Sequence, residues 1–100
     1  MLSKSQKVYL KSLCNTLKPL VMIGKNGITD SVIETAEEVL VAKELVKVSV
    51  LESCELSIDE VAIELARVTN SEIIYKIGRK VCLYRRNLRK TIIELPRWTE

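Results

Sequence analysis

The stretch that decides the fold is LVMIGKNGIT, residues 20–29. Its first four residues form a continuous apolar run, which predicts a short strand covered on both faces. Two glycines then flank a lysine and an asparagine, and Thr29 or Asp30 can cap a helix that reaches roughly to Lys43. A strand, a tight loop and a helix in direct succession indicate an α/β arrangement.

The sequence before this stretch predicts a first helix. Ser3 and Gln6 have the spacing of a capping box, and Pro19 disfavours helix at the preceding residue, so the helix should run to about Thr16. At 100° per residue, its apolar side is predicted to consist of Tyr9, Leu10, Leu13 and Leu17. Another stripe of the same helix carries Lys4, Lys7 and Lys11.

The sequence after it continues the alternation. Residues 45–51 have strand periodicity, residues 57–60 form a second capping box before a third helix, and residues 73–77 and 81–85 are predicted strands joined by a tight turn at 78–80. The expected inward residues of the second and third helices and of the middle strand are Val32, Ile33, Ala36, Val39, Leu40, Ile58, Val61, Ala62, Leu65, Val46, Val48 and Val50. Glu34, Glu37 and Glu38 are expected to point away from the core.

The resulting order is helix, strand, helix, strand, helix, strand, strand. It predicts a compact α/β domain with a mixed four-stranded sheet whose last two strands are antiparallel. One hundred residues are the size of a single domain, so we expect one domain over residues 1–100, with a basic extension from about residue 86. That extension could be a further edge strand or a tail that orders on a ligand.

The composition is that of a soluble globular protein, with 47% hydrophobic and 29% charged residues. No apolar run is long enough to span a bilayer, and no apolar segment of signal-peptide type follows the N-terminal lysines. We therefore expect a cytoplasmic protein with no membrane partner.

Charge is segregated along the chain. Residues 1–27 hold five bases and no acid, residues 28–66 hold two bases and ten acids, and residues 67–100 hold nine bases and three acids. The net charges of +5, −8 and +6 sum to the total of +3. The fold could present a basic face to a polyanion, or the acidic and basic elements could pair with each other.

Catalytic and metal-binding residues are scarce. The chain has no histidine to act as a base near neutral pH, and no nucleophile–base constellation is visible. Cys14, Cys54 and Cys82 are widely spaced, so we interpret them as three small buried residues in a reducing compartment and not as zinc ligands. We expect no enzyme activity, no cofactor, no metal and no small-molecule substrate.

The loop Gly24-Lys25-Asn26-Gly27 is the strongest candidate binding site. A helix N-terminus favours phosphate, glycines allow close approach of the backbone, and the lysines at 18 and 25 add positive charge. RNA-binding modules of the KH type use a G-x-x-G loop to hold the sugar-phosphate chain. On local sequence alone, an ordinary Asn-Gly turn is an equal alternative.

Further basic residues could extend a phosphate-binding surface. Arg79 and Lys80 lie at the predicted hairpin tip, and Arg85 and Arg86 close the last strand. Aromatic residues amount to only 4%, and Tyr75 and Tyr84 should be buried or half-buried. Trp98 could be free to stack on a base or could simply be disordered. Recognition should therefore depend on the RNA backbone more than on its bases.

Residues 17–29 resemble the signature of the CRM (chloroplast RNA splicing and ribosome maturation) family and of its stand-alone bacterial YhbY-like members. The resemblance continues through residues 44–48 and 77–85, and residues 93–96 are similar to the family's C-terminal end. It implies a fold like the C-terminal domain of translation initiation factor three, and RNA binding with residues 24–27 as the expected contact. Plant relatives act in group II intron splicing, and stand-alone members are associated with precursors of the large ribosomal subunit.

These observations lead to one leading hypothesis, a monomeric RNA-binding factor acting on ribosomal RNA in precursors of the large ribosomal subunit. The expected RNA-binding residues are Gly24, Lys25, Asn26, Gly27, Lys18, Thr29, Lys4, Lys7, Lys11, Arg79, Lys80, Arg85 and Arg86. The alternative is a protein-interaction module that docks on a ribosomal protein through its acidic helices.

Overall fold

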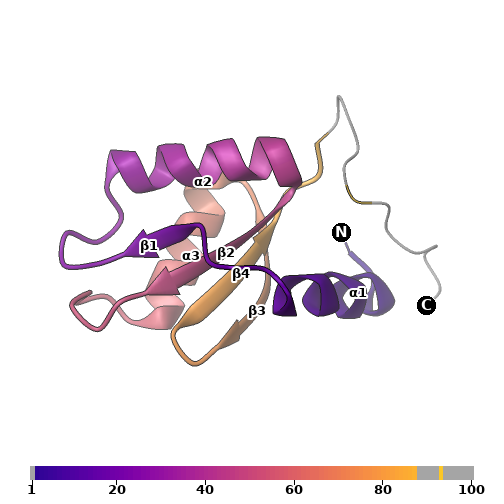
Figure 1. Ribbon diagram of the computed structural model, residues 1–100, viewed down its shortest axis with the longest axis horizontal. Helices are drawn as coiled ribbons and strands as arrows, with labels where there is room; N and C mark the ends of the chain where they lie inside the picture. The colour runs from indigo at the N-terminus through magenta and orange to yellow at the C-terminus, as the bar shows by residue number, and fades with distance from the viewer. Residues whose placement is uncertain (1, 88–92, 94–100) are drawn as a thin grey trace.

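Three helices and four strands alternate along the chain in the computed structural model, which describes residues 2–87 and residue 93. They are α1 (Lys4–Asn15), β1 (Val21–Ile23), α2 (Asp30–Lys43), β2 (Leu45–Val50), α3 (Ile58–Thr69), β3 (Glu72–Ile77) and β4 (Lys80–Tyr84) (Figure 1). The predicted element order is confirmed. Both predicted capping boxes are present, at Ser3 and at Ser57.

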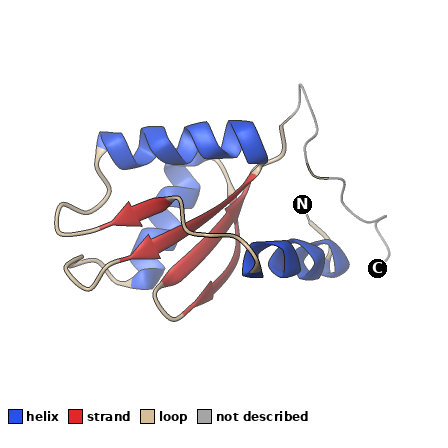
Figure 2. Cartoon of the chain, in the orientation of Figure 1, coloured by secondary structure: helices blue, strands red, loops and turns tan. Residues whose placement is uncertain are grey.

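The strands form one mixed sheet in the order β1-β2-β4-β3. β1 is parallel to β2, with Val21 beside Val48, whereas β4 is antiparallel to both of its neighbours. β1 and β3 are therefore the edges of the sheet. The loop after β1, the loop after β2 and the β3–β4 turn all lie at the same end of the sheet (Figure 2).

One face of the sheet is covered by α2 and α3. We call it the closed face (Figure 2). Val46, Val48 and Val50 point into this face, as their alternation predicts. The core between sheet and helices consists mainly of aliphatic side chains: Val21, Ile23, Ala36, Leu40, Val61, Ala62, Leu65, Val81 and Leu83, besides the three valines of β2.

Of the described helices, α1 covers the other face, which we call the half-open face, over only part of its length, and Ile93 packs on the same cluster. A disulfide joins Cys14 of α1 to Cys82 of β4, so the prediction of three free cysteines is wrong for this pair. The two cysteines are 68 residues apart in sequence, and it is the docking of α1 on the sheet that brings them together. Cys54 is free and buried, as predicted.

α1 packs through a slightly different side from the predicted one. Leu10 and Cys14 are fully buried in the contact, and Leu13 and Leu17 pack at its margin. Tyr9 is exposed, contrary to the prediction, because the disulfide-bonded Cys14 and not Tyr9 lies at the centre of the packed side.

β1 is covered on one face only, so the prediction of two covered faces is wrong. Val21 and Ile23 are buried in the closed face, but the side chain of Met22 between them is 61% exposed. The reason is that α1 packs against β2, β3 and β4 and leaves β1 open on that side. The residue before the strand, Leu20, is also half exposed.

Glu44 ends α2 in an unusual way. It is the C-cap residue with a left-handed backbone (φ 65°), and it is fully buried. Its carboxylate accepts hydrogen bonds from the backbone N–H groups of Asn87 and Ile93, at 2.5 Å each. The strand or tail considered for residues 86–100 otherwise lies outside the described residues. Across residues 2–87, no helix is long and apolar enough to cross a membrane.

Candidate nucleic-acid interface

The loop at residues 24–27 is a tight turn between β1 and α2. The N–H of Gly27 donates to the carbonyl of Gly24 at 3.0 Å, and Gly27 has a φ of +69°. Because a side chain is strained at this φ, glycine is the favoured residue there. The turn places Lys25 and Asn26 at its tip, where both are exposed.

Gly24 lies close to the segment that follows β2. A Cβ atom at this position would lie 3.3 Å from Oγ of Ser53 and 3.5 Å from a methyl carbon of Leu51, both in the segment that follows β2. The backbone conformation at Gly27 and the close packing at Gly24 thus each favour glycine, independently of any ligand. Their effect on the site is to fix the shape of the turn that carries Lys25.

Thr29 caps the helix that follows the turn. Its Oγ1 accepts a hydrogen bond from the N–H of Val32 at 3.2 Å, and Asp30 begins the first helical turn. One of the free N–H groups expected to attract phosphate is therefore bonded within the protein, and Asp30 adds a negative charge there. The positive potential of this loop comes chiefly from Lys25.

The β3–β4 turn lies at the same end of the sheet, but its arginine has a structural role. Nε of Arg79 donates to the carbonyl of Val50 at 2.9 Å, and Nη2 donates to that of Leu51 at 2.6 Å. These bonds tie the hairpin to the end of β2. Lys80 is exposed at the start of β4.

Arg85 is also committed to the fold. Nη1 of Arg85 contacts the carboxylate of Glu37 and donates to the carbonyl of Thr69, at 2.8 to 2.9 Å. Glu37 was expected to point away from the core, but this ion pair turns it toward β4 and leaves it half-buried. Arg86 is exposed at the end of the sheet opposite the glycine turn.

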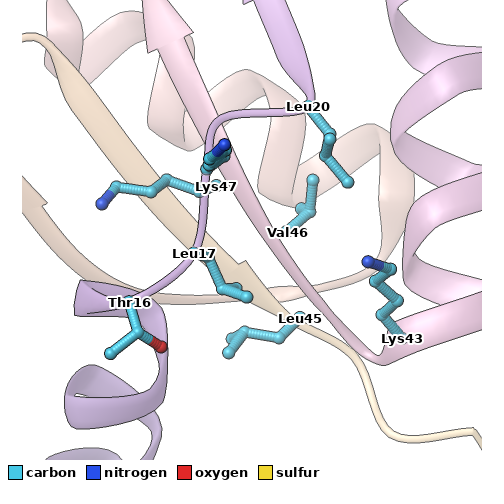
Figure 3. Close-up of a pocket in the computed structure, with 8 residues that line it drawn as sticks. Thr16, Leu17, Leu20, Lys43, Leu45, Val46 and Lys47 are labelled. Carbon is cyan, nitrogen blue, oxygen red and sulfur yellow. The ribbon is translucent and has the colours of Figure 1, made fainter.

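The predicted basic residues of α1 and Lys18 lie away from the glycine turn. Lys4, Lys7 and Lys11 are exposed on α1, and the ammonium group of Lys11 lies 5.4 Å from the centre of the Tyr75 ring. Lys18 lines a pocket at the other end of β1 together with Lys43 and Lys47 (Figure 3). Sequence reasoning did not select Lys43 or Lys47, because the helix and strand that carry them meet only in the folded chain.

The acidic residues of α2 and α3 pair partly with bases of the chain itself. Asp59 forms an ion pair with Lys76, and Glu64 with Arg67. The hydrogen bond from Arg67 lowers the pKa of the Glu64 carboxyl below its ordinary value. No cluster of three or more cysteine and carboxylate side chains suited to a metal occurs in the described part of the chain.

Comparison with known proteins decides the family. The sequence model of the CRS1/YhbY (CRM) domain matches residues 2–85. The chain belongs to the CRM domain family. This match spans all seven helices and strands of the described structure.

Relatives of this CRM domain are similar over nearly its whole length. The probable RNA-binding protein YqeI of Bacillus subtilis is 38% identical over 96% of this chain and 100% of its own. An RNA-binding protein of Haemophilus influenzae is 35% identical over 96% of both chains. The solution structure of a Staphylococcus aureus protein, described as a candidate RNA-binding protein, has a TM-score of 0.79 and 38% identity, covering 96% of this chain and all of that one.

Proposed function

We propose that this CRM domain binds RNA without catalysing a reaction on it, with the turn at residues 24–27 as a main contact. The observation that carries the proposal is the exposed Lys25 at the tip of a turn held by the Gly27–Gly24 hydrogen bond. A preformed turn loses little conformational freedom on binding, and an ammonium group at its tip can meet a phosphate. Membership of the CRM family, and relatives named for RNA binding, support the same ligand.

The RNA we propose is ribosomal RNA in precursors of the large ribosomal subunit, bound by a monomer of the protein in the cytoplasm. The support is the similarity to stand-alone YhbY-like members over the length of the chain. Crosslinking the protein in cells and sequencing the attached RNA tests this directly. Enrichment of large-subunit precursor RNA is the expected result, and a different dominant RNA would overturn the ribosomal part of the proposal.

The contact itself is tested with Lys25→Gln. We expect RNA affinity to fall roughly threefold to tenfold, and the dependence of the logarithm of affinity on that of salt concentration to become shallower by about 0.7. Arg67→Gln is the matched control, because it also removes one positive charge from an exposed side chain. Arg67 belongs to α3, one of the two helices that cover the closed face. Equal affinities of the two folded variants would exclude Lys25 from the interface.

Docking on a ribosomal protein through the acidic helices is the competing function. The internal ion pairs of Asp59 and Glu64 leave less acidic surface for it. Ribonuclease treatment of assembling particles should release the protein if RNA holds it there, and should leave it attached if a protein does.

A further inference from the structure

The pocket beside Lys18 arises from the unequal lengths of two strands. β2 has six residues and β1 only three, and β1 pairs with β2 from Val48 onward. The first half of β2 therefore has no strand beside it on that edge. A pocket of about 260 Å³ remains between this half-strand, the end of α2 and the segment that connects α1 to β1 (Figure 3).

The charge of the pocket is positive. Lys18, Lys43 and Lys47 line it, and none of its lining residues is acidic. Lys47 donates to the carbonyl of Cys14 at 3.3 Å and thereby offsets part of the negative end of α1. Among the described residues, neither Lys18 nor Lys43 has an ion-pair partner.

The helix ends are too weak to cancel this charge. The C-termini of α1 and α2 both lie near the pocket, and each contributes about half a negative charge. When the buried Glu44 carboxylate at the end of α2 is counted as well, roughly one positive charge remains of the three ammonium groups. An anionic group is therefore favoured in the pocket.

The walls of the pocket are apolar. Leu17, Leu20 and Leu45 contribute side chains to it, and Leu20 is half exposed. A small inorganic anion would leave these leucines without a partner. A nucleotide fits both features, because its phosphate is charged and its base has a flat, weakly hydrated face that packs on apolar side chains.

The pocket and the glycine turn lie at the two ends of the same short strand. The residues from Leu20 to Gly24 span about 13 Å at the rise of an extended strand. The exposed side chain of Met22 lies between them. A single RNA strand of a few nucleotides can therefore reach from Lys25 to Lys43 along the uncovered side of β1.

We propose that this pocket is a second RNA contact, which holds one nucleotide of the strand bound by the glycine turn. The phosphate is bound by Lys18 and Lys43, and the base packs on Leu17 and Leu20. This inference rests on the proposed function, since it assigns a further part of the same RNA-binding surface.

The test measures binding of an oligouridine of about sixteen nucleotides to the full chain and to three charge variants. Lys43→Gln tests the pocket, Lys25→Gln tests the turn, and Arg67→Gln is the matched control. We expect Lys43→Gln to weaken binding roughly threefold to tenfold and to lower the salt slope by about 0.7. In addition, the methyl resonances of Leu17 and Leu20 should shift when the RNA is added.

The outcomes separate the two proposals. If Lys25→Gln weakens binding while Lys43→Gln matches Arg67→Gln and the methyl resonances do not shift, the pocket proposal is overturned and the turn stands. If only Lys43→Gln weakens binding, the turn is excluded as an RNA contact. A single RNA strand that occupies both sites is then excluded too. Loss of affinity in both variants, with shifted Leu17 and Leu20 methyl groups, supports both.

Discussion

The two faces of the sheet are built in different ways. On the closed face, α2 and α3 cover the strands with aliphatic side chains that include the fully buried Leu40 and Leu65. On the half-open face, α1 covers part of the sheet through a smaller cluster that contains the Cys14–Cys82 disulfide. Most of the apolar burial that favours folding therefore lies on one side.

This difference separates stability from binding. The proposed contacts, Lys25 and the pocket lysines, are exposed or half-exposed side chains at the ends of β1, the strand that α1 leaves open. Residues on such a surface can be replaced with little effect on folding. Residues of the closed face cannot, because each packs against several neighbours.

The largest expected effect concerns the disulfide. Because it closes a loop of 68 residues, its reduction should lower the free energy of unfolding by about 4 kcal/mol. Urea unfolding with and without a reductant measures this difference. Cys54→Ala should show the same response to the reductant, and Cys14→Ala should show none. If the reductant left the urea unfolding curve of the unmodified chain unchanged, the half-open face would be stable without the crosslink.

Truncation on the closed face should have the next largest effect. Leu65→Ala leaves a cavity under α3 and should cost about 3 kcal/mol. Met22→Ala removes a similarly large side chain from the uncovered side of β1 and should change stability by less than about 0.5 kcal/mol. Urea unfolding of both variants compares the faces directly. Similar losses would contradict the distinction between them.

A smaller effect distinguishes the two basic turns at the same end of the sheet. Arg79→Ala removes two hydrogen bonds, to the carbonyls of Val50 at the end of β2 and of Leu51 just after it, and should destabilise the protein by about 1 kcal/mol, since the guanidinium is partly exposed. Lys25→Ala should leave thermal unfolding unchanged and weaken RNA binding. If Arg79→Ala lowered RNA affinity as much as Lys25→Ala without loss of stability, Arg79 would be an RNA contact.

The smallest effect is expected at alkaline pH. Burial, with the nearby Glu44 carboxylate as a second cause, raises the pKa of Tyr84 above its ordinary value of 10.0. Above pH 10 the unfolded chain loses this proton first, so stability should fall as pH rises toward the folded-state pKa. Tyr84→Phe should reduce that fall in urea unfolding between pH 9 and 11. Tyr9→Phe, at an exposed phenol, is the control.

The sequence was sufficient for most of the fold because its local patterns agree with one another. The alternation of Val46, Val48 and Val50 identified both the strand β2 and its buried side. The capping boxes at Ser3 and Ser57 located the starts of two helices. In each case residues within a few positions of one another determine the structure, so no distant contact had to be known.

The failures all involve contacts between distant segments. The Cys14–Cys82 bond, the exposure of Met22 and the Glu37–Arg85 pair depend on where α1 and α2 lie against the sheet. Local periodicity carries no information on that placement. For the candidate site, the exposed turn at Lys25 was predictable from its glycines, whereas the pocket required knowing that β1 is shorter than β2.

Glu44 has a consequence for how the sequence can vary. Its buried carboxylate binds the main-chain N–H groups of Asn87 and Ile93, and every amino acid except proline supplies such a group. The position of the returning chain is thus set partly by residue 44, together with the hydrogen bond from the Asn87 side chain to the carbonyl of Val41 and the packing of Ile93. A substitution at position 87 or 93 by any residue except proline therefore keeps the N–H group that Glu44 binds, even where the side-chain contact is lost.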